Sequence, residues 1–348
     1  MCGQFFLKIW GIIRLKAVFL ASNSSDMNLD DYREIFLKHM EARLVLKAPE
    51  TLYKPIQYLL QLGGKRLRPL LTLLSCELFD GEAKDALDAA LAIELFHNFS
   101  LIHDDIMDSA SLRRGQVTVH EKWNQNTAIL SGDALMVRSY QCFENYPPAL
   151  FKELFQLFNS TALQVCEGQQ YDMDFENSVE VRIDDYLAMI TQKTAVLIAA
   201  AMKTGAMIAG AAPTQASLLY DFGLHLGIAF QLQDDYLDTF GDPAVFGKKI
   251  GGDIVANKKT FLYLKALECA NDKDKEALLA WYQVPKDTTG KVAAVTRIFK
   301  AYQIDQLSQE AIQVHTDKAF AKLDGLRISG DKKAALRSFA RNLMQRAI

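Results

Sequence analysis

Apolar residues recur every three or four positions along most of this chain, which is the spacing of helices that bury one face. Runs in which apolar and polar residues alternate, as they do in half-buried strands, are missing from the sequence. The pattern predicts long helices over residues 30–47, 51–62, 66–79, 83–107, 126–145, 148–171, 183–209 and 214–239, with shorter ones after 259. We therefore expect one large all-α bundle.

Nothing in the sequence divides the chain into separate domains. It has 348 residues, but only eight prolines and nineteen glycines, and no low-complexity tract. We expect a single all-helical domain over residues 27–348. Residues 1–26 are apolar and interrupted by cations such as Lys8, Arg14 and Lys16, which suits neither a transmembrane helix nor a signal peptide. We interpret them as an extra segment from a misassigned start codon upstream of Met27, with a weak membrane-surface helix as the alternative and no stable membrane anchor.

Charge and cysteine usage narrow the functional classes. The formal net charge of −3 gives no broad basic field, so nucleic acid is not expected as a partner. The five cysteines are scattered singly, without the paired spacing of a zinc site. They indicate reduced thiols and a cytoplasmic protein.

Two acidic pentads, Asp-Asp-x-x-Asp, carry the main chemical signal. They occupy residues 104–108 (the first pentad) and 234–238 (the second pentad), and each follows a long apolar stretch. Residues four apart share a helix face, so the first and last aspartates of each pentad project together and repel. One pentad alone could be a solvated helix end. Two indicate a bound cation, and hard carboxylate oxygens suit Mg²⁺, which commonly shares its ligands with a phosphate.

Basic segments accompany the pentads. Residues 109–118 follow the first pentad and contain Arg113-Arg114-Gly115, while residues 241–259 follow the second and contain several lysines. Cations beside carboxylates are what a diphosphate bridged to Mg²⁺ requires. A third cluster, Gly63–Pro69, offers Lys65 and Arg68 after a pair of glycines. It indicates a second anion site, and two such sites imply two diphosphate substrates.

The segments GGKRLRP, HNFSLIHDDIMD with RRG after it, QLQDDYLD and FGKKIGGDIVANKKT together resemble the trans-type isoprenyl diphosphate synthases, the polyprenyl synthetase family. The resemblance covers the chain from about Met27 onward. It implies the isoprenoid synthase type I fold, with helices around a deep central cavity, and a homodimer. It also implies a short-chain prenyltransferase that condenses isopentenyl diphosphate with dimethylallyl, geranyl or farnesyl diphosphate through Mg²⁺-dependent ionisation, condensation and elimination.

The resemblance assigns roles residue by residue. About three Mg²⁺ would be held by Asp104, Asp108, Asp234 and Asp238, with Asp105 and Asp235 in support. The residues that match the allylic diphosphate site are Arg113, Lys193, Thr194, Gln231, Lys248 and Lys258. Those that match the isopentenyl diphosphate site are Lys65, Arg68, His97 and Arg114. Asp172 is a candidate partner for Lys193, with a plain helix-end acid as the alternative.

One departure from the family pattern precedes Lys258. The family usually has glycine there and this chain has Asn257. Asparagine tolerates left-handed backbone geometry, so we expect the turn to survive, with either Lys258 or Lys259 as the matching lysine.

Product length should depend on the apolar tunnel beneath the first pentad. Phe99 lies five residues before Asp104, about 7.5 Å along a helix axis, and is the expected tunnel floor. Phe96, nearly one turn further, is the alternative floor, and plain core packing is the simpler role for both rings. A single aromatic at this position resembles members that stop at geranylgeranyl diphosphate, with farnesyl diphosphate as the competing product.

Two other functions fit parts of the pattern. A class I terpene cyclase would share the fold and the first pentad, but it needs no isopentenyl diphosphate site. A non-catalytic subunit of a heteromeric prenyltransferase would tend to lose aspartates, and both pentads are intact here. Product formation by the purified chain alone separates these possibilities from the synthase.

Overall fold

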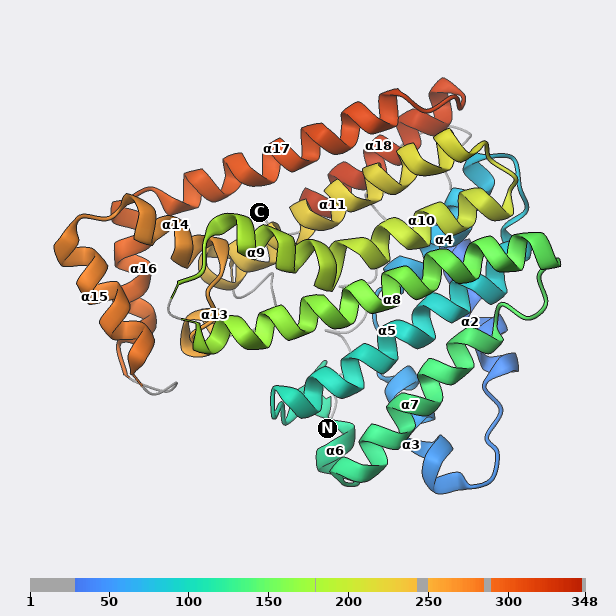
Figure 1. The fold of residues 1–348 in the computed structure, drawn as a ribbon, viewed down its shortest axis with the longest axis horizontal. Coiled ribbons are helices and arrows are strands. Elements are labelled where there is room, and N and C mark those ends of the chain that lie inside the picture. Colours follow the sequence, from blue (N-terminus) through green and yellow to red (C-terminus); the bar gives the residue numbers. More distant parts are fainter. Residues whose placement is uncertain (1–28, 179, 243–249, 285–288, 346–348) are drawn as a thin grey trace, which may run out of the picture.

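The computed structural model describes residues 29–178, 180–242, 250–284 and 289–345, which form a bundle of helices (Figure 1). The principal helices are α2 Leu29–Arg43, α3 Glu50–Gln61, α4 Leu67–Leu78, α5 Leu87–Met107, α7 Gln125–Gln141, α8 Pro148–Asn177, α10 Val196–Ile208, α11 Pro213–Phe240, α17 Ile304–Asp324 and α18 Gly330–Gln345. Shorter elements are η1 Ala83–Ala86, α6 Val119–Lys122, α9 Ile183–Ile190, η2 Thr191–Ala195, α13 Gly252–Val255, α14 Phe261–Cys269, α15 Asp272–Gln283 and α16 Lys291–Ala301. The all-α prediction is confirmed.

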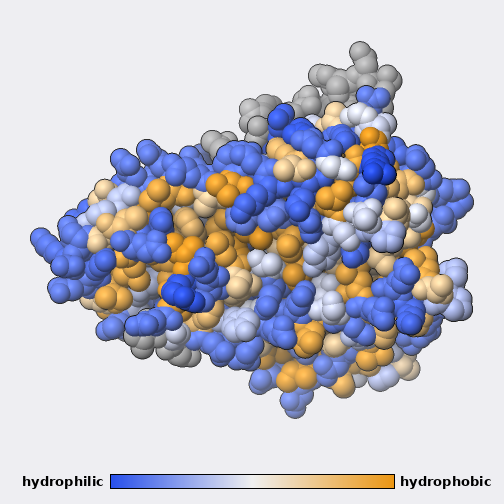
Figure 2. Space-filling model, turned by 45° about the horizontal axis from the view of Figure 1, so that its top comes forward, coloured by the Kyte–Doolittle hydropathy of each residue, from blue (hydrophilic) through white to orange (hydrophobic). Residues whose placement is uncertain are grey.

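Helix α10 runs through the centre of the bundle and packs against α4, α8 and α11. Its first seven residues, 196–202, are all buried. Small residues let the helices approach closely. A side chain at Gly205 would overlap the backbone of α4. On α11, a side chain at Gly223 would overlap residue 199 and one at Gly227 would overlap residue 195. On the face in Figure 2, hydrophilic residues cover most of the surface and apolar ones are visible between them.

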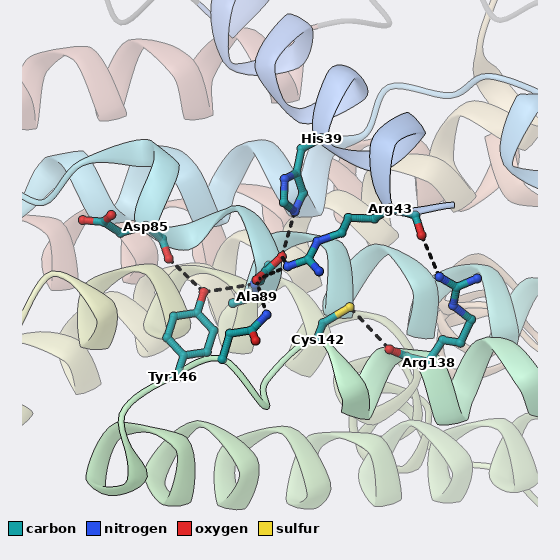
Figure 3. Close-up of polar contacts among 9 residues, drawn as sticks. His39, Arg43, Asp85, Ala89, Arg138, Cys142 and Tyr146 are labelled. Atoms are coloured by element: carbon teal, nitrogen blue, oxygen red, sulfur yellow. Dashed lines mark hydrogen bonds and ion pairs between the residues drawn. The ribbon is translucent and has the colours of Figure 1, made fainter. Parts of the chain in front are cut away.

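The amino end of α5 is fixed by a polar cluster centred on Asp88 (Figure 3). The Asp88 carboxylate accepts from Arg43 of α2 at 2.6 and 2.7 Å and from Asn145 at 3.0 Å, and it lies 2.8 Å from Nε2 of His39. Beside it, the Tyr146 hydroxyl donates to the Asp85 carbonyl at 2.9 Å. These contacts hold the end of α5 opposite the first pentad against α2 and the segment after α7.

Several boundaries differ from the prediction. The helix predicted over 183–209 is divided by a π-helical turn at Thr191–Ala195, and the one predicted over 83–107 starts with a 3₁₀ turn. Helix α8 continues to Asn177, beyond the predicted end at 171. These differences concern the winding of a helix or the residue at which it starts or ends, and apolar periodicity does not fix either to the residue.

The expectation that the chain lacks strands is wrong at one place. Residues Leu112–Arg113 (β1) and Gln116–Val117 (β2) pair antiparallel, with Leu112 opposite Val117. Arg114 and Gly115 form the turn with φ of 54° and 75°, as a two-residue hairpin turn needs. Strands of two residues are too short to show alternation, which explains the missed signal.

No described helix is both long and apolar enough to cross a membrane. The extra segment predicted over residues 1–26 lies outside the described residues.

Candidate active site

The two pentads occupy different positions on their helices. Residues 104–107 form the last turn of α5, and Asp108 is its C-cap. The second pentad lies within α11, which continues to Phe240. Each pentad lines a cavity: Asp104 lines one of about 320 Å³, the first-pentad cavity, and Asp234, Asp235 and Asp238 line one of about 190 Å³, the second-pentad cavity.

The π-helical turn joins the two cavities, because Lys193 and Thr194 line both of them. Lys193 Nζ donates to Asp172 Oδ2 at 2.6 Å, which confirms the predicted partner. Thr194 Oγ1 donates to Gln231 Oε1 at 3.1 Å. At Gly168, a side chain would overlap the backbone of Lys193, so α8 approaches the turn more closely than any larger residue allows. Wide π turns of this kind frequently occur at functional sites.

In the first pentad, the middle aspartate is committed to a cation. Asp105 is 1% exposed, and its Oδ1 accepts from Arg113 Nε and Nη2, both at 2.7 Å. Its Oδ2 is buried with no hydrogen-bond partner. Burial raises the pKa of Asp104 to about 6; Lys193 opposes this rise and Asp108 adds to it. The hairpin thus brings Arg113 onto the pentad, and Asp104 faces the cavity as a carboxylate that would gain from a cation.

In the second pentad, the middle aspartate is held by neutral donors. The Tyr186 hydroxyl donates to Asp235 Oδ2, and Gln231 Nε2 donates to Oδ1 at 2.9 Å. Burial, followed by the charge of Asp253, raises the pKa of Asp235 above its ordinary value. Asp238 Oδ2 accepts from the Asp253 backbone N–H at 2.8 Å, so this carboxylate also caps the start of α13.

The structure distinguishes the two candidate lysines after α13. Lys258 lines the second-pentad cavity, and although burial alone lowers the pKa of this lysine, the carboxylates of Asp172 and Asp253 raise it overall. Lys259 lines the same cavity, but its Nζ donates to the carbonyls of Phe175 (2.6 Å) and Ser178 at the end of α8. Lys258 is therefore the one that faces the aspartates as a cation. Lys248 lies outside the described residues.

The amino-terminal basic cluster is built around glycine geometry. Gly63 and Gly64 have φ of 79° and 124°, and a side chain at Gly64 would lie 2.8 Å from the Arg114 guanidinium. Arg114 Nη1 donates to the Gly63 carbonyl, which draws the hairpin onto this loop, where Lys65 is exposed. Arg66, which the sequence did not single out, is buried in an ion pair with Glu94 and fixes the loop from below.

Arg68 and His97 meet at the edge of the first-pentad cavity, which both of them line. Arg68 Nη1 lies 3.1 Å from His97 Nε2. Burial lowers the pKa of Arg68 to about 10, so the guanidinium stays charged at neutral pH. Burial, and then the charges of Arg68 and Arg114, hold the pKa of His97 well below its usual value. His97 is therefore neutral, with Nε2 accepting from Arg68 and Nδ1 carrying the proton.

The two candidate tunnel residues have different surroundings. Phe99 lines the first-pentad cavity and lies with its ring centroid 4.7 Å from that of His103. Phe96 is fully buried behind it, with ring centroids 5.5 Å apart, and packs edge-on against Phe158 at 5.4 Å. Only Phe99 is placed to meet a molecule in the cavity.

Two further residues of the site were not predicted. Tyr186 binds Asp235 from a helix with no motif of its own. Gln169 lines the first-pentad cavity, is 8% exposed, and has both amide atoms buried without a hydrogen-bond partner. Unpartnered buried polar atoms are rare and frequently mark a place for a ligand or water. Sequence patterns give no access to that signal.

The donor set fits Mg²⁺, although the protein does not supply a complete site alone. Within the described ranges, no three His, Cys, Asp or Glu side chains converge closely enough to hold a metal ion. Mg²⁺ commonly takes one or two carboxylates and completes its shell with water and substrate phosphates. The unpartnered buried oxygen of Asp105 and the raised pKa of Asp104 indicate carboxylates that a cation would stabilise.

Comparisons with known proteins agree with this geometry. Residues 49–300 match the model of the family described as polyprenyl synthetase. The chain is 40% identical over 299 residues to the short chain isoprenyl diphosphate synthase of Methanothermobacter thermautotrophicus, covering 86% of this chain and 91% of that protein. It is 38% identical over 297 residues to the geranylgeranyl diphosphate synthase of Methanosarcina mazei, covering 84% and 89%. A crystal structure of geranylgeranyl pyrophosphate synthetase from Pyrococcus horikoshii Ot3 has a TM-score of 0.82 and 33% identity, covering 90% of this chain and 99% of that one.

Proposed function

The chain belongs to the polyprenyl synthetase family, and on that premise we propose that it is a short-chain trans-prenyltransferase whose main product is geranylgeranyl diphosphate. It condenses isopentenyl diphosphate with an allylic diphosphate. One observation supports this most directly: the cavities of the two pentads share the π-helical turn, so cations and aspartates surround one reaction space. Relatives named geranylgeranyl diphosphate synthase and the single aromatic Phe99 favour the C20 product, with farnesyl diphosphate as the alternative.

The residues divide into two binding sets. About three Mg²⁺ would neutralise the diphosphate that leaves the allylic substrate. The residues that would hold them are Asp104, Asp108, Asp234 and Asp238. The side chains that bind the same diphosphate are Arg113, Lys193, Thr194, Gln231 and Lys258, together with Lys248 on sequence grounds. Asp105 orients Arg113, and Asp235 orients Gln231, through the hydrogen bonds described above.

Isopentenyl diphosphate binds on the other side, at Lys65, Arg68, His97 and Arg114. Neutral His97 donates through Nδ1, while Arg68 supplies charge. The apolar wall near Phe99 keeps water from the allylic cation that forms when the carbon–oxygen bond breaks. The positioned double bond attacks that cation. The departing diphosphate takes the proton that is lost in the last step.

We also infer a homodimer that forms through the outer faces of α7 and α8. Large apolar side chains are exposed there: Leu130 and Val137 are each 59% exposed, and Leu163 is 61% exposed. Such exposed apolar side chains on two consecutive helices are typical of an interface with a second copy. Light scattering after size-exclusion chromatography measures the state directly, and Leu130→Glu with Leu163→Glu should shift it to monomer.

The main experiment is a product assay. The purified protein is incubated with Mg²⁺, labelled isopentenyl diphosphate and, separately, dimethylallyl, geranyl and farnesyl diphosphate, and the dephosphorylated products are sized. A ladder that ends at C20 is expected, with no products when EDTA replaces Mg²⁺. No incorporation from any starter by the folded protein would overturn the proposal and favour a cyclase or a subunit that needs a partner.

The tunnel assignment has its own test in the same assay. Phe99→Ala should lengthen the products beyond those of the wild type, because it removes the ring that lines the cavity. Phe96→Ala should instead cost about 3–4 kcal/mol of folding free energy, because that ring is fully buried among aromatic neighbours. If Phe96→Ala lengthens products and Phe99→Ala does not, the two assignments are reversed.

A further inference from the structure

A backbone turn of unusual composition aims Lys258 at the aspartates. The short helix α13 ends in a Schellman arrangement: the Lys258 N–H donates to the Asp253 carbonyl at 2.9 Å, and the Asn257 N–H donates to that of Ile254 at 3.2 Å. This arrangement needs a left-handed residue, and Asn257 supplies it with φ of 60°. Glycine is the usual choice, because any side chain adds strain there. Asparagine adopts this conformation less readily than glycine, so contacts to its side chain would help to hold it there.

A buried lysine on another helix contacts that asparagine. Lys291 opens α16, is 0% exposed, and donates through Nζ to Asn257 Oδ1. The Lys291 ammonium also lies 5.5 Å from the centre of the Tyr282 ring, which stacks on Tyr263. The side-chain amide of Asn257 reaches the carbonyl of Val284 at 3.4 Å. Asn257 is thus held from the side by α16 and by the segment before it.

The start of α16 contacts both ends of α13. A side chain at Gly251, just before α13, would meet Val292, the residue after Lys291. Lys291 and Val292 therefore fix the orientation of α13 at its two boundaries. Burial of an ammonium group costs folding free energy unless hydrogen bonds compensate for it. A lysine at this buried position therefore depends on its bond to Asn257 more than an apolar side chain would.

We propose that Lys291 is a positioning residue, which holds Asn257 in the left-handed conformation and so directs Lys258 into the second-pentad cavity. The inference rests on the proposed function of Lys258 as a ligand of the allylic diphosphate. It assigns Lys291 a role through Asn257 and not through contact with substrate.

A double-mutant cycle tests the link between the two residues. Lys291→Met should lower kcat/KM for the allylic diphosphate about tenfold, the loss typical of one charge-assisted hydrogen bond, and leave KM for isopentenyl diphosphate unchanged. In an Asn257→Gly background, where glycine adopts the turn unaided, Lys291→Met should cost less than about twofold. Lys300→Met, an exposed lysine of the same helix, is the control for charge loss on α16.

A matched pair at position 257 keeps the test valid if Lys291→Met does not fold. Asn257→Ala should lose activity about fivefold more than Asn257→Gly, because alanine disfavours the left-handed region and accepts no bond. An equal loss from Lys291→Met in both backgrounds, or an Asn257→Ala protein as active as Asn257→Gly, would overturn the proposal.

Binding separates this outcome from a failure of the proposed function. Calorimetry with Mg²⁺ and inorganic diphosphate reports on Lys258 even if the wild type turns over no prenyl substrate. Lys291→Met should weaken the affinity for diphosphate in the wild-type background. In the Asn257→Gly background it should have little effect on that affinity. A cycle that shows no coupling in binding contradicts the positioning role, whatever the product assay gives.

Discussion

The two pentads have the same residue pattern and opposite surroundings. In the first, the buried Asp105 is neutralised by Arg113, a cation delivered by the hairpin that follows α5. In the second, the buried Asp235 is bound by Tyr186 and Gln231, which carry no charge. The first pentad also ends its helix, whereas α11 continues beyond the second. A repeated motif therefore fixes which side chains face the cavity, and the neighbouring elements decide how each carboxylate is held.

The difference indicates a division of labour. The ion pair between Asp105 and Arg113 ties the hairpin, with Arg114, to the first pentad. The donors that bind Asp235 are neutral, so any positive charge near this carboxylate must come from another part of the chain. Among the described residues, Lys258 lies close enough for its charge to interact with that of Asp235. The hairpin that directly follows α5 thus organises the first pentad. The turn after α13, which carries Lys258, organises the second.

The largest effect is expected when one cavity-facing aspartate is removed from each pentad. Asp104→Ala and Asp234→Ala should each lower turnover more than about 1000-fold, because each removes a metal ligand. Steady-state assays at saturating Mg²⁺ measure the loss, with the exposed Asp331→Ala of α18 as the control. Near-normal turnover in either aspartate variant would contradict the metal assignment for that pentad.

A second test sharpens the contrast between the two middle aspartates. Arg113→Met leaves a buried carboxylate without its cation and should cost about 3 kcal/mol of folding free energy. Tyr186→Phe removes one neutral donor from Asp235 and should cost about 1–2 kcal/mol. Urea unfolding of both variants gives the two values. Equal costs would mean that the charge of the partner does not distinguish the pentads.

The smallest effect concerns pH and the metal-free protein. Asp104 has a pKa of about 6 when folded, above the ordinary 3.8, so the folded protein binds more protons between these values. Folding stability therefore falls as pH rises from about 4 to about 6 and stays lower above that. Asp104→Asn removes this penalty, so it should stabilise the protein at pH 8 and hardly at all at pH 4.

Thermal melts in EDTA across this range provide the measurement. Asp331→Asn, at an exposed position, should show no such dependence on pH. A gain from Asp104→Asn that is the same at pH 4 and pH 8 would rule out desolvation of this carboxylate as the cause.

The sequence predicts those parts of the site that depend on spacing along one helix. The pentads and the basic connections were accessible in this way. The partnership of Lys193 with Asp172, which joins α8 to the π-helical turn, and the left-handed turn at Asn257 were expected from the resemblance to the family. Other contacts between helices were not predicted. Tyr186 and Lys291 belong to elements without motifs, and Gln169 lies in the segment 168–172, which resembles the family but gave this residue no predicted role. The importance of all three comes from what they meet in three dimensions. Burial of a polar atom without a partner is likewise a property of the fold.

The π-helical turn at Thr191–Ala195 has a further consequence for the rod formed by α9 and α10. A turn that closes one residue later than an α-helical turn shifts the two halves of the rod by about 100° in phase. Helix α10 keeps its buried face on the bundle centre, while α9 is rotated so that Tyr186 reaches Asp235. Deleting a single residue such as Gln192 would restore regular winding and rotate Tyr186 away from α11. The contact between Tyr186 and Asp235 therefore depends on the exact number of residues in the π-helical turn, which is far from either aspartate motif in the sequence.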